Sequence, residues 1–254
     1  MLDFINELAV LAGEESLKYF GKITKGDISG KATSKDLVSI ADKAVEKLII
    51  SKINERFPGH DVFGEETGHA GKTSEYCWII DPIDGTQSFV KHHPYYAVSI
   101  ALYKNGKPYA AAVNIPALGR LYTAQLGKGA FENGEPIRIS DCTELDEAAC
   151  ATGFARLREN KVEKVLEKFN RIVPELRSIQ RCGSAASDLA LTGAGIYDGY
   201  WEEGLQLYDV AAGVLIVQEA GGKVCDYNGK DNYPADGIVA GPAPIVEKLL
   251  DLLH

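Results

Sequence analysis

The chain opens with apolar side chains at the spacing of amphipathic helices. They recur every three or four residues over 2–20 and again over 42–56, where Pro58-Gly59 ends the pattern. After residue 60 the pattern changes to short β-branched and aromatic runs, which predict strands. Asn105-Gly106 and Asn133-Gly134 are typical of two-residue hairpin turns between such strands. The strands expected in this half are 61–64, 76–80, 97–104, 110–115, 121–125 and 130–132.

The second half alternates helical and strand patterns. Its expected helices are 159–172, 184–195, 208–221 and 243–253, and its expected strands are 149–152, 178–181, 199–202, 222–226 and 237–240. This succession predicts an α+β protein built from alternating layers of helix and sheet. Because no Pro/Ser-rich linker separates the halves, we expect them to pack intimately, with a boundary near residue 145.

Composition narrows the classes of protein to consider. With 254 residues and 45% hydrophobic content, the chain can bury a large core. The net charge of −9 and the lack of any Lys/Arg run argue against nucleic-acid and acidic-membrane partners. The N-terminus does not read as a signal peptide and no stretch approaches the ~20 apolar residues of a membrane span, so we expect a cytoplasmic protein. The five cysteines include no C-x-x-C pair, which argues against a disulfide framework or a zinc site.

The segment Trp78-Ile-Ile-Asp-Pro-Ile-Asp-Gly-Thr-Gln-Ser-Phe89 carries the clearest chemistry. It places Asp81 and Asp84 at the end of an apolar strand, and two carboxylates so close together repel unless a cation lies between them. Pro82 and Gly85 predict a tight turn, which would expose backbone amides beside the pair. This arrangement suits a phosphate whose oxygens bridge to Mg²⁺. Taken alone, the segment fits an ordinary Asx turn equally well.

Further acids stand at the ends of other predicted elements, where each one singly fits a helix cap or a solvated surface acid. They are Asp42, Glu65, Glu66 and Asp209. In chain order the sequence reads Asp, then Gly-Glu-Glu, then Asp-Pro-Ile-Asp-Gly-Thr, then Asp-x-x-Ala, with Glu-Ala-Gly-Gly at 219–222. From about Lys31 to Gly222, this order resembles the inositol monophosphatase family of the Mg²⁺-dependent, lithium-sensitive sugar phosphatases.

The resemblance implies a fold and a metal site. The fold would be a layered αβαβα sandwich of the sugar phosphatase type, with a metal-binding half at 1–145 and a substrate-capping half at 146–254 that can also be counted as one domain. Relatives are commonly homodimers and use two or three Mg²⁺ ions. One ion would be bound by Glu65, Asp81 and the Ile83 carbonyl, and a second by Asp81, Asp84 and Asp209.

The resemblance also implies catalysis by a metal-activated water, with no covalent intermediate on the protein. Thr86, together with Asp42 and Glu65, would orient that water or accept its proton. From the residues alone, Thr86 could merely cap the following turn, and Asp42 could be the dipole partner of the helix that it starts. Lys31 aligns with a loop lysine near the metals.

On the substrate side, Gly183-Ser-Ala-Ala186 looks like the family's substrate loop, and Glu202 stands where inositol phosphatases bind a polyol hydroxyl. The substrate contacts that the resemblance implies are Asp84, Gly85, Thr86, Gly183, Ser184, Ala185, Glu202 and Asp209. A small phosphorylated polyol, myo-inositol monophosphate, is therefore the first candidate substrate.

Two positions favour a different substrate. Ser88 and Tyr208 stand where the family usually has Asn and Trp, and relatives that hydrolyse histidinol phosphate favour Ser and Tyr there. Histidinol-phosphate phosphatase is therefore the alternative, followed by other small sugar or nucleotide phosphatases. Outside the enzymes, the alternative is a non-catalytic homologue that binds a phosphate ligand, against which the full set of carboxylates speaks.

Overall fold

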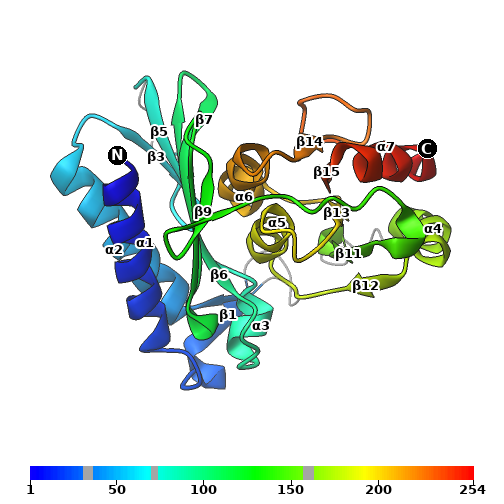
Figure 1. The fold of residues 1–254 in the computed structure, drawn as a ribbon. Coiled ribbons are helices and arrows are strands. Elements are labelled where there is room, and N and C mark those ends of the chain that lie inside the picture. The colour runs from blue at the N-terminus through cyan, green and yellow to red at the C-terminus, as the bar shows by residue number, and fades with distance from the viewer. Residues whose placement is uncertain (31–36, 70–73, 157–162) are drawn as a thin grey trace.

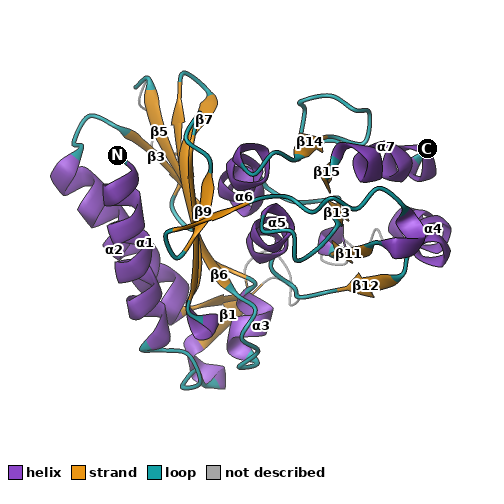
Figure 2. Cartoon of the chain, viewed as in Figure 1, coloured by secondary structure: helices purple, strands orange, loops and turns teal. Residues whose placement is uncertain are grey.

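Helices and sheets alternate as layers in the computed structural model, which describes residues 1–30, 37–69, 74–156 and 163–254 (Figure 1). Helices α1 (Leu2–Leu17) and α2 (Ile40–Arg56) lie side by side on one face of a large sheet. Helices α5 (Ala185–Gly193) and α6 (Leu207–Glu219) lie between this sheet and a smaller one, as Figure 2 shows. The far face of the smaller sheet is covered by α4 (Glu163–Ile172) and α7 (Ala243–Leu253). The predicted α+β class and αβαβα layering are confirmed.

The large sheet has eight strands in the order β10-β9-β8-β7-β6-β5-β3-β4. Their bounds are β3 Asp61–Gly64, β4 Gly68–His69, β5 Tyr76–Asp84, β6 Ala97–Lys104, β7 Lys107–Ile115, β8 Arg120–Gln125, β9 Ala130–Glu132 and β10 Glu135–Ile137. The smaller sheet has five strands in the order β12-β11-β13-β15-β14. They are β11 Ala149–Thr152, β12 Ser178–Gln180, β13 Gly199–Glu202, β14 Lys223–Cys225 and β15 Ile238–Gly241.

Of the apolar clusters that hold these layers together, the two largest involve the large sheet. One lies between the large sheet and the N-terminal helices, where Ile5 and Ile49 pack with Trp78. The other extends from Tyr122 of the large sheet through Leu215 of α6 to β15 of the smaller sheet. Because the second core contains residues from both sheets, the two halves bury a common apolar surface.

Both N-terminal helices differ from their predicted bounds. α1 ends at Leu17, although the apolar spacing continues to Phe20, because Phe20 packs instead with Phe89 and Tyr96, at ring separations of 5.6 and 5.2 Å. α2 begins at Ile40, two residues before its predicted start. Its N-cap is Ser39, so Asp42 is the third residue of the helix, where it completes a capping box, and not the first.

Short elements were missed by the sequence analysis. α3 (Thr86–Val90) contains too few residues to show a helical period, and β1 (Ile28–Gly30) pairs with β2 (Leu37–Ser39) over three residues each. Short 3₁₀ helices occupy Lys25–Asp27, Pro116–Leu118, Leu145–Glu147 and Val173–Glu175. The predicted start of the helix at 159–172 lies outside the described residues.

All five cysteines are free. Within the described ranges, no helix is both long and apolar enough to cross a membrane.

Candidate active site

The first two acids meet because β3 and β5 are parallel. Gly64 lies opposite Ile80, so the residues that follow, Glu65 and Asp81, lie side by side at the same end of the two strands. The Glu65 amide donates to the Ile80 carbonyl at 3.2 Å and fixes this step. Asp81 is 1% exposed, so its carboxylate lies inside the molecule.

Asp84 reaches the same place because β5 continues past the predicted end of the strand. The register against β6 shifts between Asp81 and Asp84, which marks a bulge at Pro82 and Ile83. The Ile83 amide donates to Asp81 Oδ1 at 3.0 Å inside this bulge. The sequence predicted a strand followed by a turn, whereas the structure places both acids within one irregular strand.

Asp209 is brought to the pair by the first turn of α6. Gln206 caps this helix, and its amide donates to Asp209 Oδ2 at 2.6 Å. Ser99, which lies opposite Asp81 across β5 and β6, donates its hydroxyl to the Tyr208 carbonyl at 3.3 Å. Sequence reasoning missed Ser99, for which the only signal was a hydroxyl in an otherwise apolar strand.

Asp81, Asp84 and Asp209 form a buried group in which each offers a carboxylate oxygen within 4.8 Å of the others. Burial raises the pKa of Asp81 well above its usual value, and the negative charges of Glu65, Asp84 and Asp209 raise it further. A divalent cation would relieve this repulsion. Because every donor is a carboxylate oxygen, the group fits Mg²⁺, the ion that the resemblance implied.

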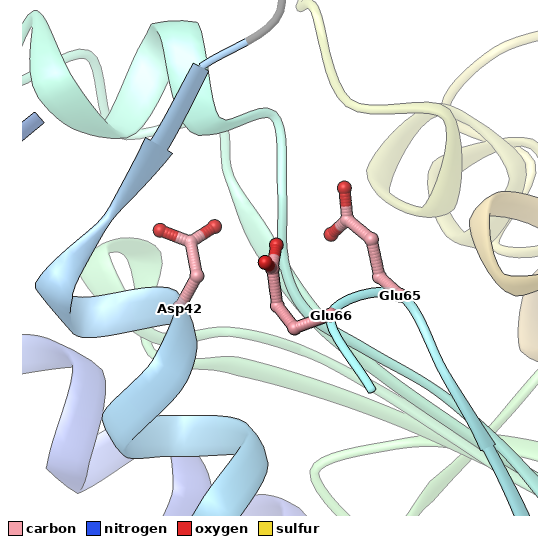
Figure 3. Close-up of side chains that lie close together, drawn as sticks. All are labelled: Asp42, Glu65 and Glu66. Atoms are coloured by element: carbon pink, nitrogen blue, oxygen red, sulfur yellow. The ribbon is translucent and has the colours of Figure 1, made fainter. Parts of the chain in front are cut away.

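A second group consists of Asp42, Glu65 and Glu66, whose oxygens also lie within 4.8 Å of one another. Figure 3 shows Asp42 at the start of α2 and both glutamates on the turn that follows β3. Burial raises the pKa of Asp42 to about 6, against the lowering effect of hydrogen bonds from Ser39. Sequence reasoning noted Glu66 but gave it no role, and the Glu-Glu doublet was the available signal.

Thr86 and Asp42, which the resemblance pairs at the attacking water, lie within hydrogen-bonding distance of each other. Thr86 Oγ1 lies 3.3 Å from Asp42 Oδ1 and 3.2 Å from the Ile83 carbonyl oxygen. Asp42 Oδ2 also accepts the amide and hydroxyl of Ser39, at 2.8 and 2.6 Å. Asp42 is therefore both a helix cap and a neighbour of Thr86, so the two interpretations are compatible.

The predicted substrate loop packs directly on the strand end. Ser184 caps α5, and its hydroxyl donates to Asp84 Oδ2 at 2.6 Å. The Ala186 amide donates to the same oxygen at 2.7 Å, a contact that sequence reasoning missed. Gly85 has φ of 89°, and a Cβ on it would lie 2.9 Å from the Gly183 carbonyl oxygen. Glycine at 85 therefore permits both the turn and the close approach.

Glu202 is buried at the end of β13, and its carboxylate accepts two hydrogen bonds from neighbouring residues. Oε2 accepts the Tyr200 hydroxyl at 2.7 Å, and Oε1 accepts the Ala155 amide at 2.9 Å. A Cβ on Gly153 would collide with this carboxylate. Sequence reasoning named Glu202 but not the residues that orient it.

Asp188 is a further buried acid that the sequence analysis did not consider. Burial raises its pKa well above the usual value, and the nearby charges of Glu202 and Asp84 raise it further. The signal was an acid in a helix whose other residues are small or apolar.

Lys31, expected near the metals, lies outside the described residues.

Comparisons with known proteins identify the family of the chain. The model of the inositol monophosphatase family matches residues 1–253. The Nus factor SuhB of Pseudomonas aeruginosa is 37% identical over 261 residues, which cover 100% of this chain and 96% of that protein. An inositol-1-monophosphatase of Mesorhizobium japonicum is 34% identical over 251 residues, covering 98% and 94%. The crystal structure of the extragenic suppressor protein suhB from Bartonella henselae has a TM-score of 0.94 at 35% identity, covering 99% and 97%.

Proposed function

Because the chain belongs to the inositol monophosphatase family, we propose that it is a Mg²⁺-dependent phosphomonoesterase that hydrolyses myo-inositol monophosphate. The observation that carries this proposal is the buried group of Asp81, Asp84 and Asp209. Asp81 and Asp84 come from the large sheet and Asp209 from α6, and their carboxylates lie close together. Three carboxylates in so little space are unfavourable for the fold unless cations bind them.

The proposed ion sites are those that the resemblance implies. Glu65, Asp81 and the Ile83 carbonyl would hold one Mg²⁺, and Asp81, Asp84 and Asp209 a second. The Asp42, Glu65 and Glu66 group supports the expectation of a third ion. When bound, Mg²⁺ supplies charge neutralisation for the phosphate and lowers the pKa of the attacking water.

The chain's own residues would do the rest of the reaction. Thr86 and Asp42 would orient the water and take up its proton as the water oxygen attacks phosphorus. The ester P–O bond breaks, and the departing alkoxide oxygen takes a proton and leaves as the alcohol. The Gly85 and Thr86 amides would orient the phosphate oxygens. No side chain forms a covalent bond to phosphorus in this scheme.

Recognition of the polyol would fall to the second half of the chain. Glu202, oriented by Tyr200 and Ala155, would accept hydrogen bonds from ring hydroxyls. Gly183, Ser184 and Ala185 would line the opposite side of the ring. The alternative substrate, histidinol phosphate, retains support from Ser88, whose hydroxyl donates to the Cys182 carbonyl at 3.2 Å, and from Tyr208.

The test is phosphate release by the purified protein with Mg²⁺. The panel is inositol 1-phosphate, histidinol phosphate, fructose 1,6-bisphosphate and 3′-phosphoadenosine 5′-phosphate. We expect kcat/KM to be highest for inositol 1-phosphate. If it is highest for another compound of the panel, that compound becomes the proposed substrate instead. No release from any of them would favour the non-catalytic binding protein.

We also propose that the protein works in the cytoplasm as a homodimer with no nucleic-acid partner. The net charge of −9 supports the last point. Light scattering coupled to size-exclusion chromatography would test the dimer, because a single species of monomer mass contradicts it.

A further inference from the structure

Glu46 is a buried carboxylate for which the proposed reaction has no use. It lies one turn after Asp42 on α2 and is 1% exposed. Its Oε2 accepts the Glu66 amide at 2.9 Å, and its Oε1 accepts the Thr67 amide at 2.8 Å. Both amides belong to the 65–67 turn, which carries the predicted metal ligand Glu65.

The backbone of β3 also closes around this carboxylate. A Cβ on Gly64 would lie 2.8 to 2.9 Å from all three atoms of the Glu46 carboxyl group. Glu46 therefore contacts the chain immediately before Glu65 and hydrogen-bonds the chain immediately after it. The position of Glu65 depends on both contacts because no residue lies between them and Glu65.

The 65–67 turn borders a pocket on the side that faces Glu46. The pocket, of about 530 Å³, lies between the turn and one face of α2. Its lining includes Glu46 itself, with Lys43, Lys47, Ile50, Glu66 and Thr67. Because side chains do not fill this space, the two hydrogen bonds to Glu46 hold the turn where packing against α2 is incomplete.

We infer that Glu46 is a positioning residue, which holds the 65–67 turn so that Glu65 presents its carboxylate to Mg²⁺. The inference rests on the proposed metal-dependent function. A carboxylate suits this task because both of its oxygens accept hydrogen bonds, whereas an amide would turn an NH₂ group toward one of the two N–H donors. Groups that orient metal ligands commonly affect metal affinity strongly.

The test is Glu46→Gln, with Glu219→Gln as the matched control. Glu219 accepts the amides of Gly127, Lys128 and Gly129 at 2.8, 3.1 and 2.8 Å, so it too is a carboxylate that holds a backbone turn. It lies ten residues from Asp209 along α6, or about 15 Å. A general loss of turn stability would therefore appear in both variants.

The primary measurement is Mg²⁺ binding by isothermal titration calorimetry, without substrate. Glu46→Gln should bind Mg²⁺ roughly 10- to 100-fold more weakly, and Glu219→Gln should bind it as the wild type does. At saturating Mg²⁺, kcat of Glu46→Gln should return close to the wild-type value. Wild-type affinity in Glu46→Gln, or an equal loss in both variants, would overturn the inference.

Two further outcomes keep the result interpretable. If Glu46→Gln does not fold, Glu46→Asp keeps the charge but shortens the reach by one methylene, and wild-type Mg²⁺ affinity in that variant would overturn the inference. If the wild-type protein binds Mg²⁺ but releases phosphate from no substrate, the phosphatase proposal fails while weakened binding in Glu46→Gln still supports Glu46.

Discussion

Asp84 has two tasks that its carboxylate performs with different partners. It belongs to the buried acidic group, and its Oδ2 accepts the Ser184 hydroxyl and the Ala186 amide from α5. The sequence predicted the first task from the Asp-Pro-Ile-Asp-Gly-Thr motif. The second could not be predicted, because it depends on a contact across about 100 residues, between a strand end and a helix start.

Asp84→Asn should separate these tasks. An asparagine oxygen can still accept both hydrogen bonds from α5, but the loss of charge weakens Mg²⁺ binding and turnover should be abolished. Without Mg²⁺ the melting temperature should hold or rise, because one of the repelling charges is gone. Phosphate release and thermal melts in EDTA measure the two effects. A near-normal kcat at modest Mg²⁺ would contradict the two-metal assignment.

Glu202→Gln tests substrate recognition at the same scale. Loss of one charge-assisted hydrogen bond should lower kcat/KM for inositol 1-phosphate by about ten- to a hundredfold, or roughly 1.5–3 kcal/mol, mainly through KM. A small aryl phosphate, which lacks the ring hydroxyls, should be little affected. The control is Glu203→Gln, because Glu203 pairs with Lys168 at 2.6 Å. Equal losses on both substrates would instead assign Glu202 to the support of the fold or the metals.

At the scale of elements, the candidate site lies where two turns come into contact. The corner from β5 to α3 touches the loop before α5, since a Cβ on Gly85 would lie 2.9 Å from the Gly183 carbonyl oxygen and 3.1 Å from Ser184 Cβ. Gly134 is a matched position, with φ of 88° against 89° but no atom within 4 Å of its Cβ position. The pair separates backbone strain from steric overlap.

Gly85→Ala should therefore be more damaging than Gly134→Ala. Both variants incur the strain of a positive φ, about 1–2 kcal/mol. Only Gly85→Ala also forces apart the two turns, which should cost about 1–3 kcal/mol more and lower kcat/KM. Urea denaturation and phosphate release measure both effects. If the two alanine variants were equally stable and equally active, the contact would have no energetic weight.

Elements with a long apolar repeat were predicted well from the sequence. Short elements and local irregularities of the backbone were predicted poorly. α7 occupies its predicted 243–253, because a repeated apolar face marks its whole length. β5 runs four residues beyond its predicted end because a bulge accommodates Pro82 within the strand. α3 was missed because five residues span little more than one turn.

At the scale of the whole molecule, the candidate site is built from two neighbouring layers, the large sheet and the helices behind it. Asp81 and Asp84 belong to the large sheet, and Asp209 belongs to α6, which packs between the sheets. The layered fold was predicted through the resemblance, whereas the hydrogen bond from Ser99 to the Tyr208 carbonyl, which links β6 to α6, was not. Bound cations would consequently stabilise the assembled halves and not one element alone.

This coupling makes the stability of the molecule depend on pH and Mg²⁺ together. Burial raises the pKa of Asp42 to about 6 and that of Asp81 well above its usual value. A carboxyl with a raised pKa binds its proton more tightly in the folded state than in the unfolded one. In EDTA, both groups should therefore add stability as pH falls. For Asp42 this contribution appears as pH falls through about 6 and is lost as pH rises through the same value.

Mg²⁺ competes with those protons, so its effect on stability should have the opposite dependence on pH. The increase in melting temperature caused by excess Mg²⁺ should be largest near pH 8 and should shrink as pH falls through about 6. Thermal melts at each pH, one with EDTA and one with Mg²⁺, measure this increase. Subtracting the two melting temperatures removes the effect of groups elsewhere in the chain that titrate equally in both. Asp42→Asn should flatten part of the dependence seen in EDTA. An increase that stays constant from about pH 8 to about pH 5 would show that these carboxyls do not hold the ions.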